Sequence, residues 1–229
     1  MSGGMPMPGG WTMSMAWMRM PGQTRLDAAA SFLAMWVVMM VAMMLPSLVP
    51  MLARYRRGVR ARDETSLDRL SALAGAGYFA VWTIFGAAVY PVGLALGAAE
   101  MRWKGLARSV PIATGLVLLL AGGLQLTAWK VRQLGHCREA PGGACALAPD
   151  ANTAWRHGLG LGVHCARCCS GLMAVLLVTG VMDLGAMGSV ATAITVERLA
   201  PSPAPAARAV GALVMAVGAL VVVRAASVR

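Results

Sequence analysis

Charged residues are scarce in this sequence, and acidic residues are the scarcest. Only 13% of the 229 residues are charged, with 9 Asp and Glu against 20 Lys and Arg. Paired carboxylates, a nucleophile with its base, a glycine-rich phosphate loop and a haem-attachment motif are all missing at a convincing spacing. These absences argue against catalysis, and the sequence assigns no catalytic or cofactor-binding residue.

A cleavable signal peptide and a soluble domain are also not visible, since residues 1–27 lack the apolar core of a signal. What the chain has instead is apolar sequence. Hydrophobic residues make up 58% of it, and the mean hydropathy is +0.66. This is well above what a soluble domain of this length needs for one core. The composition predicts a polytopic membrane protein.

Long runs without charge divide the chain into candidate membrane helices. Six segments qualify, and they are 28–53, 70–99, 109–129, 158–182, 184–196 and 209–223. The first three each exceed the roughly 20 residues that cross a bilayer as a helix. The fourth carries Arg167 as its only internal charge, and the last two need flanking residues to reach across. We expect an all-α transmembrane bundle of about six spans, with five as the alternative.

The chain divides into two parts. Residues 28–229 form a single transmembrane domain, in which the proline-rich connector "APSPAPAAR" separates the last two candidate spans. Residues 1–27 form a methionine-rich segment that we predict to be flexible and outside the membrane. It has seven methionines in its first twenty residues. Such a segment could deliver soft metal ions through its thioethers, or it could be simply disordered.

The net charge of +11 would suggest nucleic acid in a soluble protein, but here the arginines sit between apolar segments. The loop 54–69 holds six arginines, and the segment 130–157 is also basic. The positive-inside rule places both loops in the cytoplasm and both termini outside. The predicted partner is therefore the lipid bilayer and not nucleic acid.

Three cysteines and a histidine share one short segment, "HCARCC". Cys165, Cys168 and Cys169 are spaced i, i+3 and i+4, so a helix puts them on one face, with His164 one step round. In the predicted topology they lie about 10 Å inside the cytoplasmic surface. Because cytoplasmic thiols are usually reduced, we interpret them as ligands or redox thiols. Cys137 either completes this site or is a loop thiol.

The first span runs the opposite way and is rich in methionine. Met40 and Met44 form one i, i+4 row beside a second row that includes Met43, and Met44 lies at the same depth as Cys165. Thiols and thioethers together favour a soft ion such as Cu(I), with zinc as the alternative. Methionines in apolar helices also serve simply as packing residues. Pro46, with Pro50, should bend this helix near its end.

Three polar residues and three glycines in or next to the predicted spans are expected to have structural roles. Arg167 should find a partner within the bundle, and Glu197 is the predicted one. Asp183 is expected either to cap a helix or to bind an ion. The glycines of the fourth span permit close helix approach, and they are Gly158, Gly162 and Gly171.

Several motifs in order resemble a known family. "MWVVMMVAMMLPSLVPML", "AGGLQLTAWKVRQLGHCR", "GLGLGVHCARCCSGLMAVLLVTGVMDLGAM" and "ERLAP" are similar to the bacterial domain of unknown function 2182, predicted metal-binding integral membrane proteins. The resemblance implies a multi-pass protein of the bacterial inner membrane. It implies a metal region that comprises Met43, Met44, Pro46, Cys165, Cys168 and Cys169. This chain departs from many members by carrying Gln133 where they have a cysteine, and by lacking an extra first span.

The combined prediction is a membrane protein that binds a soft metal ion, copper before zinc, for handling or transport. Another membrane subunit or a metallochaperone would then be a partner. Two alternatives stay open. In the first, Cys165 and Cys168 form a redox disulfide that Cys169 or Cys137 resolves. In the second, the chain is a non-catalytic assembly subunit and its sulfur residues only pack.

Overall fold

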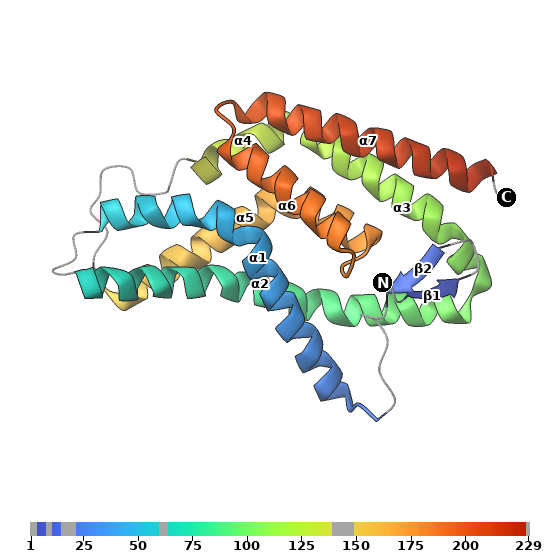
Figure 1. Cartoon of the computed structure of the whole chain (residues 1–229), viewed down its shortest axis with the longest axis horizontal. Coiled ribbons are helices and arrows are strands. Elements are labelled where there is room, and N and C mark those ends of the chain that lie inside the picture. Colours follow the sequence, from blue (N-terminus) through green and yellow to red (C-terminus); the bar gives the residue numbers. More distant parts are fainter. Residues whose placement is uncertain (1–3, 8–10, 15–21, 60–63, 139–148, 228–229) are drawn as a thin grey trace.

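The chain folds into a helical bundle, with one small hairpin near its N-terminus (Figure 1). A computed structural model describes residues 4–7, 11–14, 22–59, 64–138 and 149–227. Its elements in chain order are β1 (Gly4–Met7), β2 (Trp11–Ser14), α1 (Arg25–Gly58), α2 (Glu64–Arg102), α3 (Lys104–Gln125), α4 (Ala128–Arg138), α5 (Ala151–Thr179), α6 (Leu184–Leu199) and α7 (Pro203–Ser227).

Five of the described helices are long and apolar enough to cross a membrane: α1, α2, α3, α5 and α7. The prediction of a helical membrane bundle is confirmed. The sixth predicted span, 184–196, corresponds to α6, which has only 16 residues. At 1.5 Å per residue it reaches about 24 Å, which is less than the ~30 Å of a hydrocarbon core. By length and composition the described residues therefore hold five candidate spans, and the shorter α6 leads the chain back along α5 to the start of α7.

Helix α1 changes direction along its length, as Figure 1 shows, and it contains Pro46 and Pro50. Proline removes a backbone hydrogen bond and its ring clashes with the preceding turn, which accounts for the bend. The first half of α1 is anchored to α2 through Trp36. Its indole N–H donates to the carbonyl of Trp82 at 2.9 Å. The ring fits because Gly86 faces it, where an added Cβ would lie 2.5 Å from the Trp36 ring.

Helices α2 and α5 lie side by side, and glycine makes this possible. A Cβ added at Gly158 would come within 2.0 Å of the carbonyl oxygen of Ala74, and one at Gly77 within 2.7 Å of the carbonyl of Trp155. Glycine also allows α3 and α7 to pack closely, because Gly115 and Gly218 face each other's carbonyls. Small residues let membrane helices approach backbone to backbone. The predicted packing role of Gly158 is confirmed.

The methionine-rich N-terminal segment contains two paired strands. In their antiparallel register, Gly4 lies opposite Ser14 and Met7 opposite Trp11. The indole N–H of Trp11 donates to the carbonyl of Ala107 on α3 at 2.9 Å, which docks the hairpin onto the bundle. The flexibility of residues 1–27 as a whole stays a prediction.

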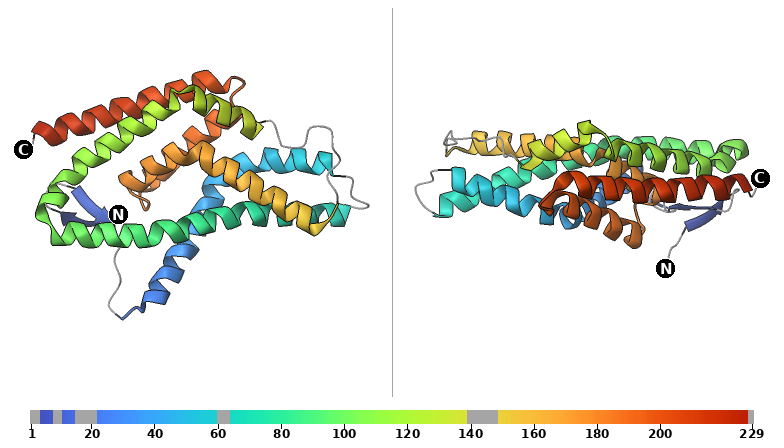
Figure 2. Two further views of the ribbon diagram at one scale, coloured as in Figure 1. Left: turned by 180° about the vertical axis from the view of Figure 1, so that it is seen from behind. Right: turned by 90° about the horizontal axis from the view of Figure 1, so that it is seen from above.

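Three helix ends next to the basic loops gather at one end of the molecule. Figures 1 and 2 show the end of α1 and the starts of α2 and α5 at this end, and both termini toward the other. This arrangement agrees with the predicted topology, in which the basic loops lie on one side of the membrane and the termini on the other. The orientation in the membrane, with the basic end in the cytoplasm, stays a prediction.

Candidate metal centre

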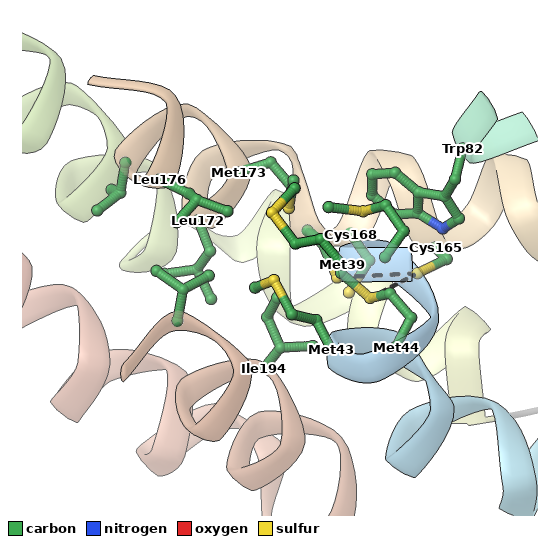
Figure 3. Close-up of a cluster of buried hydrophobic side chains, with 14 of the residues drawn as sticks. Met39, Met43, Met44, Trp82, Cys165, Cys168, Leu172, Met173, Leu176 and Ile194 are labelled. Atoms are coloured by element: carbon green, nitrogen blue, oxygen red, sulfur yellow. Dashed lines mark hydrogen bonds between the residues drawn. The ribbon is translucent and has the colours of Figure 1, made fainter. Parts of the chain in front are cut away.

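The inner faces of α1 and α5 meet in a core that is rich in sulfur. Along α5, the cysteines continue an i, i+3, i+4 stripe with Leu161 and Leu172, and this stripe is buried. Along α1, four methionines occupy the buried face with exposed fractions of 5% or less, namely Met39, Met40, Met43 and Met44. Figure 3 shows Met43, Met44, Cys165 and Cys168 within this shared interior. Helical periodicity thus turns both sulfur rows inward.

Cys165 lies at the middle of a set of three sulfur atoms. Its Sγ is 3.9 Å from the Sδ of Met44 and 3.9 Å from the Sγ of Cys169. With metal–sulfur bonds of about 2.3 Å, ligands at trigonal angles around one ion lie roughly 4 Å apart. The separations of Cys165 from Met44 and from Cys169 are both close to this value. Two thiols and a thioether on buried helix faces are also the chemistry that Cu(I) prefers.

A cation from α6 touches the same sulfur atoms. The Nη2 of Arg198 donates to the Sγ of Cys165 at 3.0 Å and to the Sγ of Cys169 at 3.3 Å. Its Nη1 lies 4.0 Å from the Sδ of Met51. The hydroxyl of Tyr78 on α2 donates to Cys165 as well, at 2.9 Å. The guanidinium is thus placed to compensate the negative charge that a thiolate would carry at this position.

A buried ion pair sits beside the sulfur set. The Nζ of Lys130 is 2.8 Å from Oε2 of Glu197, and both side chains are almost fully buried, with exposed fractions of 3% and 2%. Lys130 also donates to the carbonyl of Cys168 at 2.7 Å, and the amide of Gln125 donates to Oε1 of Glu197 at 2.6 Å. This network links α4, α5, α6 and the end of α3. Each of the three side chains has at least one buried partner, which lowers the cost of burying it in a membrane interior.

The predicted pairing of Arg167 with Glu197 is wrong, because Lys130 occupies that carboxylate and Arg167 is exposed. The physical reason is helical geometry: a residue two positions after Cys165 is turned about 200° away from it and so leaves the buried stripe. Asp183 is the N-cap of α6, where its carboxylate accepts from the backbone N–H of Ala186 at 2.7 Å. Of the two interpretations for Asp183, helix capping is confirmed.

The other predicted ligands differ in how deeply they are buried. Cys168, Met40 and Met43 are buried in the same apolar core. His164 is only partly buried, and in the described part of the chain no three His, Cys, Asp or Glu side chains form a group that could hold a metal. Cys137 belongs to the backbone of α4, but its side chain lies outside what the structure describes. A metal-binding role for each of these residues stays a prediction.

The sequence interpretation missed three residues of this centre: Arg198, Tyr78 and Lys130. A usable signal existed for Arg198, because a second charge directly follows Glu197 at the end of an apolar segment. Lys130 likewise follows a long charge-free run, but it looked like the first residue of a loop. Tyr78 carried no signal, since aromatic residues are common in apolar helices.

The fold and the site define a class: a multi-pass helical membrane protein with a buried centre of thiols and thioethers. The chain belongs to the PpoB2 family, whose description is copper chaperone and whose model matches residues 33–221. The matched residues include Met44, Cys165, Cys169 and Arg198. The more specific resemblance to domain of unknown function 2182 stays a prediction. No curated protein and no solved structure matches the chain.

Proposed function

We propose that this protein binds Cu(I) inside the membrane and passes it to another protein. The observation that carries the proposal is the position of Cys165, whose Sγ lies 3.9 Å from both Met44 Sδ and Cys169 Sγ. The family's description as copper chaperone supports the choice of ion. Since zinc makes little use of a thioether, the presence of Met44 favours copper.

The methionines of α1 support movement of the ion along the helix. Met39, Met40, Met43 and Met44 are buried within six residues of one another, in the same core as the cysteines of α5. Thioethers are uncharged ligands of Cu(I), so the ion can move from one methionine to the next without being trapped at any of them. We infer that copper reaches the thiols along this stripe. The protein would then sit in a bacterial inner membrane and receive or deliver copper through a partner subunit or metallochaperone.

The test is anaerobic Cu(I) binding by purified protein in detergent, in competition with a chromogenic Cu(I) chelator. We expect one tightly bound ion per chain, lost in the double variant Cys165→Ser and Cys169→Ser. Met44→Leu should weaken binding about tenfold, because it conserves volume and removes one ligand. Met182→Leu is the matched control, since Met182 is 49% exposed. Elution as a single monodisperse species shows that each variant is folded.

Unchanged copper binding in the double cysteine variant would overturn the proposal. Metal-free wild-type protein that forms a reversible disulfide would instead favour the redox alternative. In the described part of the chain Cys165, Cys168 and Cys169 form no disulfide, and the Sγ atoms of Cys165 and Cys169 lie 3.9 Å apart. Counting thiols before and after mild oxidation separates these outcomes.

A further inference from the structure

Arg198 is a buried cation whose partners are sulfur atoms. The buried charged side chains of the described chain are Lys130, Glu197 and Arg198. Lys130 and Glu197 neutralise each other at 2.8 Å, whereas no salt bridge to a carboxylate involves Arg198 among the described residues. The Nε of Arg198 has no hydrogen-bond partner there either. The guanidinium charge is therefore available to the metal centre.

Arginine keeps its charge under all conditions in a protein, so it contributes one fixed positive charge to the site. A monovalent ion bound by two thiolates carries one net negative charge, and the guanidinium brings the total to zero. A divalent ion on the same two thiolates is already neutral, and the guanidinium leaves one positive charge in excess. An uncompensated charge in a buried, water-poor site is strongly unfavourable.

We propose that Arg198 is the residue that makes this centre select a monovalent soft ion over a divalent one. The proposal rests on the proposed function, because it assumes that Cys165 and Cys169 are ligands. The geometry supports it directly: Nη2 contacts both sulfurs, at 3.0 and 3.3 Å, so its charge acts on the two atoms that would hold the ion. The fixed positive charge would disfavour Zn²⁺ at this cysteine pair, although thiolates otherwise bind zinc well.

Ag(I) and Cd(II) make the sharpest probes, since both are soft ions with a filled d shell and they differ by one charge. Two unit charges ~4 Å apart at an effective dielectric constant of ~20 shift an equilibrium about 1000-fold. Relaxation around the site reduces this to roughly 100-fold. We therefore expect Arg198→Met to lower the ratio of Ag(I) to Cd(II) affinity on the order of 100-fold. Arg198→Lys, which keeps the charge, should hold the ratio within a few-fold of wild type.

Two further variants separate charge from packing. Arg198→Gln also removes the charge but keeps a hydrogen-bond donor, so it should shift the ratio as Arg198→Met does, and it replaces that variant if the latter does not fold. Met51 Sδ lies 4.0 Å from Nη1 of Arg198. Adding Met51→Lys to Arg198→Met returns a cation to the neighbouring position and should restore part of the preference for Ag(I). A purely structural role for Arg198 predicts no such rescue.

The measurement is a competition titration of purified protein in detergent, with bound Ag(I) and Cd(II) counted after desalting. A ratio within threefold of wild type in both neutral variants, with Ag(I) still dependent on Cys165 and Cys169, would overturn the selection by charge and leave the proposed function standing. Wild-type protein that holds neither ion through these cysteines would overturn both.

Discussion

Replacing one residue of the buried pair formed by Lys130 and Glu197 should destabilise the bundle more than replacing both residues. Both groups are almost fully buried and 2.8 Å apart. Lys130→Met leaves a carboxylate with only the Gln125 amide as partner, and Glu197→Gln leaves an ammonium without a counter-charge. Removing one partner of a buried pair costs about 3 kcal/mol, so two independent losses would sum to about 6 kcal/mol.

The double variant behaves differently, because it takes both charges out of the membrane interior. We expect Lys130→Met with Glu197→Gln to cost about 1–2 kcal/mol, which means a coupling of at least ~3 kcal/mol. The assay is reversible unfolding in mixed detergent micelles, followed by far-ultraviolet circular dichroism. Arg167→Leu is the control, since Arg167 is exposed and lies off the buried face of α5, so its effect should simply add to that of Glu197→Gln.

Losses that simply add in the double variant would show that the two side chains do not meet in the folded protein. They would also weaken the proposal for Arg198. That proposal counts charges on the assumption that Lys130 and Glu197 neutralise each other. Losses that do not add between Arg167→Leu and Glu197→Gln would instead support the pairing expected from sequence.

Two further perturbations test the packing and the orientation. Gly158→Ala should lower stability by about 1–3 kcal/mol and weaken copper binding, since its Cβ would meet the carbonyl of Ala74 at 2.0 Å. Gly160→Ala, where nothing lies within 4 Å, should be tolerated, and equal unfolding temperatures for the two variants would refute this packing. Cysteine labels at position 64 should react only from the cytoplasmic side and labels at position 26 only from outside; the reverse pattern would invert the topology.

The sequence alone determined the membrane class and the location of most helices. Runs of about 20 apolar residues without charge have one stable conformation in lipid, because every backbone group must be bonded within the helix. The helical repeat also determined that Cys165, Cys168 and Cys169 share a face. Depth along each span followed from the rise per residue, and this was enough to bring Met44 and Cys165 to the same level.

The tertiary structure decided the rotation of each helix about its axis and the choice of neighbours. On sequence, Arg167 was the predicted partner of Glu197 and Lys130 looked like a loop residue, but Lys130 forms the ion pair. The contact of Arg198 with Cys165 joins residues 33 positions apart through the return of α6 along α5. Such contacts depend on how side chains interlock between helices, and apolar sequence carries little information about that because lipid and protein interiors are equally apolar. The sequence therefore determined which sulfur residues share a helix face and a depth, whereas the packing of the helices decided which charges lie beside them.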